Sequence, residues 1–168
     1  TAQPSSVFES DLRYRQKQSL SNKTALAKVA FKHIHTGQAI LLDEASTILP
    51  IVRLLPGIAP VTVITNFQPV IRELTRFSDI GLICLGGNYN QRYDTFTGPI
   101  CEQTVSTLRA NTWITSTTAV YDGSAYHPDP QVANVKRTMM TVADKKIMLL
   151  DYTKFGKTAI HKLAHLNE

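Results

Sequence analysis

Residues 39–47 read AILLDEAST, and this stretch decides the fold of the chain. Four apolar residues run from Ala39 to Leu42 with no polar alternation, which is typical of a strand that is covered on both faces. From Ile48 onward the apolar residues recur at helical spacing. We therefore predict a buried strand that leads through a short polar loop into a helix over residues 48–55. In open α/β sheets, ligands bind outside the carboxyl ends of such strands.

The composition describes an ordinary globular domain. The chain has 168 residues, of which 43% are hydrophobic and 18% charged, enough for one domain with a sizeable core. No apolar run approaches the roughly 20 residues that a membrane span needs, and the first residues lack the order of a signal peptide. Two cysteines, Cys84 and Cys101, fit a reducing compartment, so we expect a cytoplasmic location and a buried Cys84.

The chain is basic, with a formal net charge of +5 and a pI of about 9.3. This charge permits nucleic acid or an anionic ligand as a partner and does not decide between them. Two groups of basic residues stand out, and we interpret both as solvated surfaces. The first contains Arg13, Arg15, Lys17 and Lys23, and the second contains Lys136, Arg137, Lys145, Lys146, Lys154, Lys157 and Lys162.

Apolar segments of strand type alternate with segments of helical type along most of the chain. This alternation predicts an α/β fold with a mostly parallel sheet. We expect strands at residues 39–42, 61–65, 80–85, 112–117 and 147–150, and helices at 21–34, 48–55, 70–74, 99–110 and 130–142. Residues 88–98 and 118–127 are expected to be loops, and residues 1–20 an arm or linker.

Polar residues follow each predicted strand, and the carboxyl ends of parallel strands meet at one edge of a sheet. Carboxylates at this edge bind sugar hydroxyls, whereas hydroxyls, backbone N–H groups and lysines bind phosphate. A small polyol phosphate fits this mixture. For each residue the alternative is a helix cap or a satisfied turn. The residues at the five ends are Asp43, Thr65 and Asn66, Gly86 and Gly87, residues 115–117, and Asp151.

Several common motifs are absent from the sequence. Neither GxGxxG nor GxxxxGK[ST] occurs, which argues against a nucleotide cofactor. No paired-cysteine zinc pattern and no GxSxG elbow is present. His161 and His165 are four residues apart and could share a helix face, but the sequence offers no third metal ligand. We therefore expect no cofactor, no metal and no catalytic residue.

An ordered set of short segments resembles the C-terminal effector domain of DeoR-family bacterial transcriptional regulators. The strongest part is a Lys-Arg pair, Lys136 and Arg137, followed by Asp-x-[Ser/Thr]-Lys-Phe-Gly. The segments are KVA (28–30), TG (36–37), LD (42–43), ST (46–47), VITN (63–66), LGG (85–87), GP (98–99), VKR (135–137) and LDYTKFG (150–156). The resemblance covers nearly everything after about Leu20.

The resemblance implies a three-layer α/β/α fold similar to ribose-5-phosphate isomerase and the CoA-transferase-like fold. It implies a sensor domain over residues 21–168, shortened at the C-terminus, and an arm over residues 1–20 from a missing N-terminal winged helix-turn-helix. The effector would be a phosphorylated sugar or a related metabolite, and operator DNA would be bound through the missing domain. The isomerase's phosphate loop resembles residues 45–47. Lys136 stands near the position of the isomerase's catalytic glutamate, which implies sensing without turnover.

Two residues depart from the family pattern. The family loop usually reads Asp-Ser-Gly-Thr-Thr, whereas Glu44 and Ala45 stand here in place of the small residue and the glycine. Ala45 restricts φ where glycine would let the backbone approach a phosphate. Glu44 adds negative charge beside the expected anion site unless it points away or pairs with a lysine.

We thus expect the effector-sensing domain of a transcriptional regulator, a repressor of a sugar-utilisation operon, in a homo-oligomer such as a dimer or tetramer. The alternative is a sugar-phosphate isomerase or related enzyme, and a further alternative is direct DNA binding by the basic patches. No membrane partner is expected. The predicted effector-binding residues are Asp43, Glu44, Ala45, Ser46, Thr47, Thr65, Asn66, Gly86, Gly87, Lys136, Asp151 and Lys154.

Overall fold

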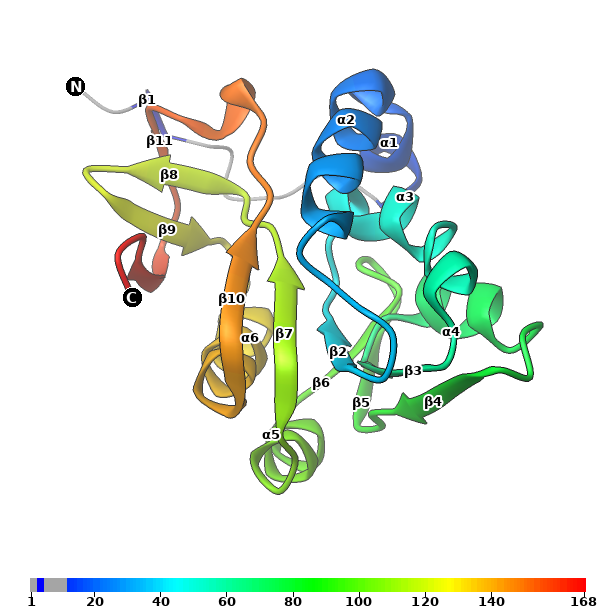
Figure 1. Ribbon diagram of the computed structural model, residues 1–168. Coiled ribbons are helices and arrows are strands. Elements are labelled where there is room, and N and C mark those ends of the chain that lie inside the picture. The colour runs from blue at the N-terminus through cyan, green and yellow to red at the C-terminus, as the bar shows by residue number, and fades with distance from the viewer. Residues whose placement is uncertain (1–2, 5–11) are drawn as a thin grey trace.

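A five-stranded parallel sheet forms the centre of the molecule (Figure 1). The computed structural model describes residues 3–4 and 12–168. The parallel sheet predicted from the sequence is confirmed. Its strands, in spatial order, are β10 (Ala143–Met148), β7 (Ala110–Thr115), β2 (Ala39–Leu42), β3 (Val61–Thr65) and β4 (Ile80–Cys84).

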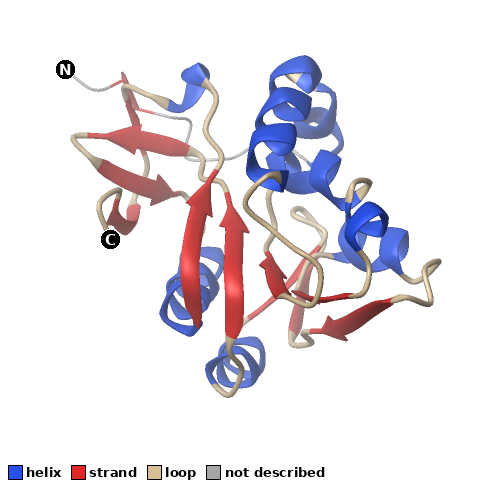
Figure 2. Ribbon diagram, in the orientation of Figure 1, coloured by secondary structure: helices blue, strands red, loops and turns tan. Residues whose placement is uncertain are grey.

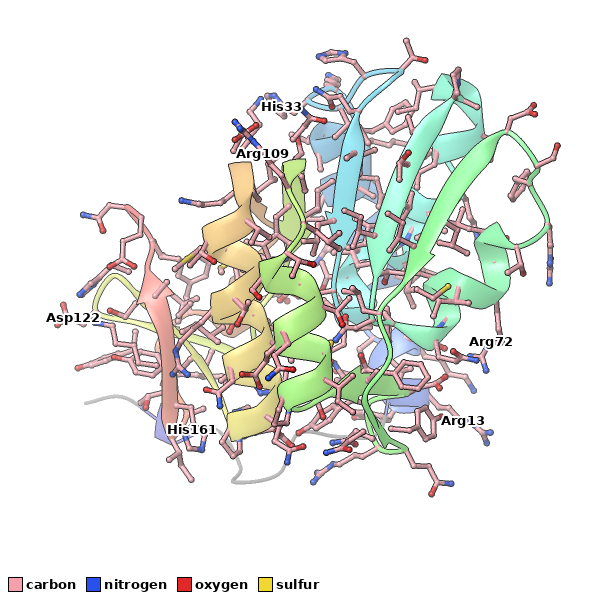
Figure 3. All side chains as sticks on the ribbon, turned by 90° about the horizontal axis from the view of Figure 1, so that it is seen from below. Arg13, His33, Arg72, Arg109, Asp122 and His161 are labelled. Carbon is pink, nitrogen blue, oxygen red and sulfur yellow. The ribbon has the colours of Figure 1, made fainter. Side chains whose placement is uncertain are left out.

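Helices cover both faces of this sheet, which gives the expected three-layer α/β/α architecture (Figure 2). Alternate residues of β2 serve the two cores: Ile40 and Leu42 belong to one cluster, and Leu41 belongs to the other. The first cluster includes residues of α2 (Leu20–Phe31), α3 (Leu49–Val52) and α4 (Gln68–Leu74). The second includes residues of α5 (Pro99–Ser106) and α6 (Pro130–Val142), which lie side by side in Figure 3.

The helix predicted over residues 48–55 is broken into three short pieces. A 3-10 turn η1 (Ser46–Ile48) precedes α3, and a second turn η2 (Leu55–Ile58) follows it. Pro56 lacks the N–H that would continue the helical ladder, so the chain tightens into a turn there. The macrodipole of a four-residue helix is small, and an anion at this strand end must therefore be held mainly by side chains.

Both segments that were predicted to be loops form antiparallel hairpins. One joins β5 (Asn88–Asn90) to β6 (Thr95–Thr97), and the other joins β8 (Ala119–Tyr121) to β9 (Ser124–His127). The second hairpin turns at Asp122 and Gly123, where φ is 45° and 64°. Aspartate and glycine tolerate this left-handed conformation better than other residues.

A third strand, β12 (His161–His165), pairs with β9 and makes the second hairpin a three-stranded sheet. The expectation that His161 and His165 share a helix face is therefore wrong, because both lie on this strand. His165 Nδ1 is 3.0 Å from Ser124 Oγ. Within the described residues, no group of three or more His, Cys, Asp or Glu side chains is placed to hold a metal ion.

The ends of the chain contain additional short elements. The predicted arm contains helix α1 (Leu12–Lys17), and α2 begins at Leu20; residues 1–2 and 5–11 of the arm lie outside the described part. Strand β1 (Gln3–Pro4) pairs in parallel with β11 (Lys157–Thr158), which follows the turn η3 (Tyr152–Lys154). No helix within the described ranges is long and apolar enough to cross a bilayer.

The expectation of a buried Cys84 is wrong. Cys84 is exposed because β4 is an edge strand that pairs only with β3. Cys101 is the buried thiol, and burial raises its pKa to about 12.

Candidate functional site

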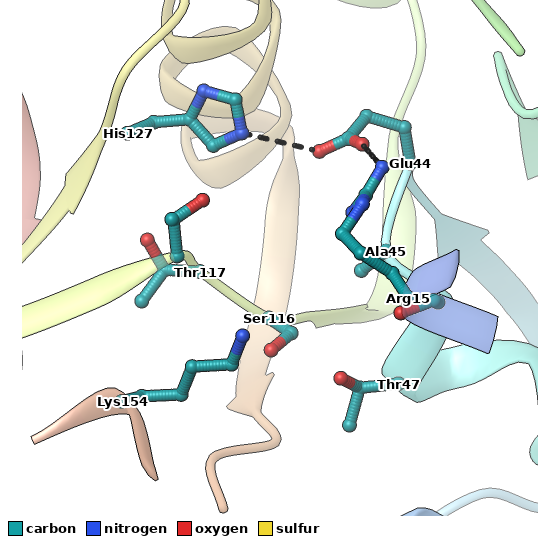
Figure 4. Close-up of a pocket in the computed structure, with 10 residues that line it drawn as sticks. Arg15, Glu44, Ala45, Thr47, Ser116, Thr117, His127 and Lys154 are labelled. Atoms are coloured by element: carbon teal, nitrogen blue, oxygen red, sulfur yellow. Dashed lines mark ion pairs between the residues drawn. The ribbon is translucent and has the colours of Figure 1, made fainter. Parts of the chain in front are cut away.

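A small cavity lies beyond the carboxyl end of β2 (Figure 4). Its wall is made by the loop that follows β2, by the segment between β7 and β8, and by single residues from α1, β9 and η3. Hydroxyl and cationic side chains dominate this wall. The lining residues are Arg15, Glu44, Ala45, Ser46, Thr47, Ser116, Thr117, Thr118, His127 and Lys154.

Asp43 lies behind the cavity and is fully buried. Its Oδ2 accepts hydrogen bonds from Trp113 Nε1 at 3.1 Å and Thr115 Oγ1 at 2.5 Å. The same oxygen is 2.9 Å from Lys136 Nζ. Asp43 therefore ties β2 to β7 and α6. Among the described residues, its Oδ1 has no hydrogen-bond partner.

Lys136 is shared between two buried carboxylates. Its Nζ is 2.9 Å from Asp43 Oδ2 and 3.5 Å from Glu44 Oε1, and it also donates to Ser116 O at 3.2 Å. Lys136 is only 2% exposed and does not line the cavity. Its charge is thus balanced by the two acids, so the expectation that Lys136 faces the effector as a counter-charge is not supported by this placement.

Glu44 is the carboxylate that reaches the cavity. Its Oε1 is 3.6 Å from His127 Nε2, and its Oε2 is 3.6 Å from Arg15 Nη2 (Figure 4). Glu44 therefore points toward the cavity and pairs with a lysine, an arginine and a histidine at once. These three partners compensate the negative charge that Glu44 adds beside the expected anion site.

The pKa values of the two acids shift in opposite directions because the acids differ in partners. Burial favours the neutral form of both. For Glu44 this effect is outweighed by Lys136, by the bond from His127 and by Arg15, so its pKa falls to about 2. For Asp43 burial prevails over Lys136 and the bond from Thr115, and the pKa is raised. Glu44 is thus the permanently charged acceptor at the cavity.

The tautomer of His127 follows from its neighbours. Its Nδ1 accepts a hydrogen bond from Asp129 N at 3.1 Å, so the neutral ring carries its proton on Nε2, which faces Glu44. The ring also lies against Tyr93, with 5.7 Å between the ring centroids. His127 is therefore fixed in orientation by the start of α6, where Asp129 is the N-cap.

Ala45 and Ser46 follow the end of β2, and Ser46 connects it to α2. Ala45 has φ −142° and ψ 121°, which is extended backbone that alanine adopts without strain, so the lack of glycine distorts nothing here. Ser46 Oγ accepts a hydrogen bond at 3.1 Å from Nζ of Lys23, a buried lysine of α2. The same Nζ donates to the backbone oxygen of Arg15.

Lys154 reaches the cavity from the opposite side. It ends η3, whose N-cap is Asp151, and Asp151 Oδ1 accepts from Thr153 N at 2.9 Å. Asp151 therefore holds the turn that presents Lys154 and does not itself line the cavity. For Asp151 the structure therefore favours the role of an N-cap over that of a residue that binds the hydroxyls of a ligand.

Thr65 and Asn66, at the end of β3, bind other parts of the protein: Thr65 the turn that follows β3, and Asn66 the first hairpin. Thr65 Oγ1 accepts from Phe67 N at 3.0 Å, and Asn66 Nδ2 donates to Phe96 O at 2.8 Å. Asn66 O also accepts from Thr95 Oγ1 at 2.8 Å. Both side chains are buried and lie outside the cavity lining, and Asn66 holds the β5–β6 hairpin over the strand end.

Gly86 and Gly87 also lie outside the cavity lining. Gly87 has φ 136°, and a Cβ there would lie 2.5 Å from Thr97 O. A glycine is required at position 87 because β6 and α5 approach its backbone closely. A Cβ at Gly86 would meet no atom of the described residues within 4 Å. At Gly87 the expected close approach of the backbone is thus made to β6 and α5 rather than to a ligand in the cavity.

The structure brings five of the twelve predicted site residues together around the cavity, namely Glu44, Ala45, Ser46, Thr47 and Lys154. It adds five that the prediction missed: Arg15, Ser116, Thr117, Thr118 and His127. The hydroxyl run at 115–117 was noticed as a strand end, and Arg15 was assigned to a solvated surface. His127 carried no signal, because only the β8–β9 hairpin brings it to Glu44.

The family model of the DeoR C terminal sensor domain matches residues 18–168. The L-fucose operon activator of Haemophilus influenzae is 31% identical over 87% of this chain and 59% of its own length. The transcriptional repressor AccR of Agrobacterium fabrum is 28% identical over 88% of this chain and 58% of its own length. The chain thus spans about three fifths of these relatives.

A similar fold occurs in ribose 5-phosphate isomerase A of Methanocaldococcus jannaschii. The TM-score is 0.59 with 15% sequence identity, over 82% of this chain and 55% of the isomerase. At this identity the likeness concerns the fold alone.

Proposed function

The chain belongs to the DeoR C terminal sensor domain family, and we propose that it binds a phosphorylated sugar, or a related phosphorylated metabolite, at the cavity beyond β2 without converting it. Ser46, Thr47 and Lys154 would hold the phosphate. Glu44 would accept hydroxyls, with Asp43 behind it. The observation that carries this assignment is the pairing of hydroxyls and a lysine with a charged, buried acceptor in one cavity.

Open hydrogen-bonding capacity supports the same cavity. Among the described residues, Thr118 Oγ1 and Glu44 Oε2 are buried atoms of the lining without a hydrogen-bond partner, although Glu44 Oε2 is near the Arg15 guanidinium. Buried polar atoms are normally satisfied, so each such atom needs an explanation. A hydroxyl group of a sugar would supply a donor to Glu44.

The state of the acids argues against turnover. An aldose–ketose isomerisation needs a general base whose pKa lies near the working pH. Glu44 has a pKa of about 2 and is held by Lys136, His127 and Arg15. A carboxylate paired with three partners is a weak base and a good fixed acceptor. The isomerase alternative is therefore disfavoured.

In the whole protein, we infer that this domain controls transcription of a sugar-utilisation operon through an N-terminal winged helix-turn-helix, as residues 1–20 would lead to it. The relatives named above include an activator and a repressor, so both directions of control occur in the family. A homo-oligomer, either a dimer or a tetramer, suits binding to a palindromic operator. Light scattering on the domain would measure this state.

A thermal-shift panel tests the proposal. It would contain inorganic phosphate, sugar phosphates including ribose 5-phosphate, and the same sugars without phosphate. We expect stabilisation by phosphorylated compounds only, and no loss of ribose 5-phosphate in a parallel isomerase assay. Lys154→Ala should weaken the response about tenfold or more, whereas Lys145→Ala, an exposed lysine on β10, should not. Turnover of ribose 5-phosphate, or equal responses of both variants, would contradict the proposal.

A further inference from the structure

Two cations beside the cavity come from the helices that precede the sheet. Arg15 belongs to α1 and Lys23 to α2. Arg15 Nη2 is 3.6 Å from Glu44 Oε2, and Lys23 Nζ donates to Ser46 Oγ at 3.1 Å. Arg15 lies before the segment that the family model matches, which begins at residue 18. Lys154 lines the same cavity as Arg15, from η3 (Figure 4).

The cavity is nearly full in the present arrangement. It has room of about 10 Å³ for the centre of a water-sized sphere, which corresponds to about one water molecule. A sugar phosphate is many times larger. Arg15 is a large side chain of the lining and reaches Glu44 from outside the sheet. Entry of a sugar phosphate therefore requires this side chain to move.

Helix α1 is attached in a way that permits such a movement. Of its six residues, only Leu12 is buried, and burying one leucine contributes only about 1.5–3 kcal/mol. The Arg15 guanidinium is also held over the Tyr93 ring, 5.5 Å from its centroid. Within the described part of the chain, α1 is thus anchored by Leu12 and by the polar and cation–π contacts of Arg15.

We propose that α1 closes the effector cavity and that Arg15 and Lys23 form the cationic half of its anion subsite, with Arg15 leaving Glu44 to bind the phosphate of the effector. This inference rests on the proposed function, which assigns a phosphorylated ligand to the cavity. Glu44 keeps Lys136 and His127 and accepts a ligand hydroxyl in place of the guanidinium. The ligand thus makes different contacts in the two positions of α1.

The crowding of charge supports this role. Lys23, Arg15 and Lys154 are close enough that the last two lower the pKa of Lys23, in addition to the larger effect of burial; Asp151 opposes them. Like charges at this proximity repel one another. A phosphate between them would relieve the repulsion. The same movement of α1 supplies the differential contact that an effector needs to alter a distant site.

The test uses five single variants and inorganic phosphate as the probe, with calorimetry to measure affinity. Arg15→Gln and Lys23→Met should each weaken phosphate binding about tenfold or more. The matched controls Lys17→Gln on α1 and Lys28→Met on α2 remove exposed charges from the same helices and should leave the affinity within about twofold of wild type. Arg15→Lys should restore part of the lost affinity, because it keeps the charge.

A separate experiment tests whether Arg15 moves from Glu44 to the phosphate. Glu44→Gln releases Arg15, so it should tighten phosphate binding in the parent chain and much less in Arg15→Gln. Tighter or unchanged phosphate binding by Arg15→Gln would overturn the inference. If Arg15→Gln is still stabilised by sugar phosphates as the parent is, the proposed function survives that result. If the parent chain binds neither inorganic phosphate nor any sugar phosphate, both fail.

Discussion

Two neighbouring strands of the central sheet end in polar residues, but different segments of the chain cover these two ends. At β2, Glu44 and Ser46 face an opening that is lined by residues from four other parts of the chain. At β3, Asn66 binds the backbone of the β5–β6 hairpin and is buried beneath it. The two ends have similar sequences, since each follows an apolar run with a short polar pair.

The difference between the two ends is what covers them. A hairpin closes the end of β3 and binds Asn66 through Phe96 O and Thr95 Oγ1. The end of β2 is covered by α1 and η3, which contribute long cationic side chains instead. A polar strand end is therefore a candidate site when the covering segments bring charged side chains to it, as Arg15 and Lys154 do at β2.

The largest expected effect concerns the buried charges at β2. Lys136→Met removes the cation that Asp43 and Glu44 share. Removing one partner of a buried ion pair costs about 3–5 kcal/mol, so the free energy of unfolding should fall by this amount near pH 7. Urea denaturation measures it. Lys145→Met, an exposed lysine, is the control.

The pH dependence provides a second check on Lys136→Met. The fall in the free energy of unfolding caused by Lys136→Met should shrink as the pH is lowered and the carboxyls of Asp43 and Glu44 become protonated. A loss below about 1 kcal/mol near pH 7, within the range of an ordinary surface substitution, would contradict the view that β2 ends in a compensated charge cluster.

An intermediate effect concerns the glycines after β4. Gly87→Ala places a Cβ 2.5 Å from Thr97 O at a φ of 136°, so it should lower the free energy of unfolding by about 1–3 kcal/mol. Gly86→Ala meets no described atom within 4 Å and should change it by less than about 0.5 kcal/mol. Neither variant should alter phosphate affinity. A large loss of affinity in Gly86→Ala would mean that this strand end is also part of the site.

The smallest effect concerns Lys23. Its pKa is lowered from 10.5 to about 8, by burial first and then by Lys154 and Arg15. The folded chain therefore pays the full cost of the buried charge below pH 8, and this cost is relieved as the pH rises from 8 to 10.5. Relative to Lys23→Met, the parent chain should gain stability across this window.

The charge of sulfate is constant in this pH range. Saturating sulfate should therefore make the stability difference between the parent chain and Lys23→Met depend less on pH. Thermal denaturation from pH 7 to 10.5 follows both curves, with Lys28→Met as the control. Parallel curves without sulfate would show that the pKa of Lys23 is not lowered.

The sequence was sufficient for most of the central sheet and for the loop after β2, but β10 runs over Ala143–Met148 rather than the predicted 147–150. Uninterrupted apolar runs such as residues 39–42 locate buried strands, and their alternation with helices determines the layers. The hairpin over residues 119–127 was missed although Asp122 and Gly123 form a strong turn signal. That signal was outweighed by the irregular polarity of its neighbours.

The composition of the site was only partly predictable. Glu44, Ser46 and Thr47 are local to the strand end, so the sequence reveals them. Arg15 and His127 reach the cavity through tertiary contacts, and nothing in their local sequence distinguishes them from surface or core residues. Asp151 and Asn66 were selected by position, yet their hydrogen bonds are made to a turn and to a hairpin.

The most direct measurement is a crystal structure of the chain with the sugar phosphate that stabilises it most in the thermal-shift panel. The account predicts phosphate oxygens within about 3 Å of Ser46 Oγ and Lys154 Nζ, and a sugar hydroxyl at the same distance from Glu44. A ligand bound instead at the ends of β3 and β4, against Asn66 and Gly86, would contradict it.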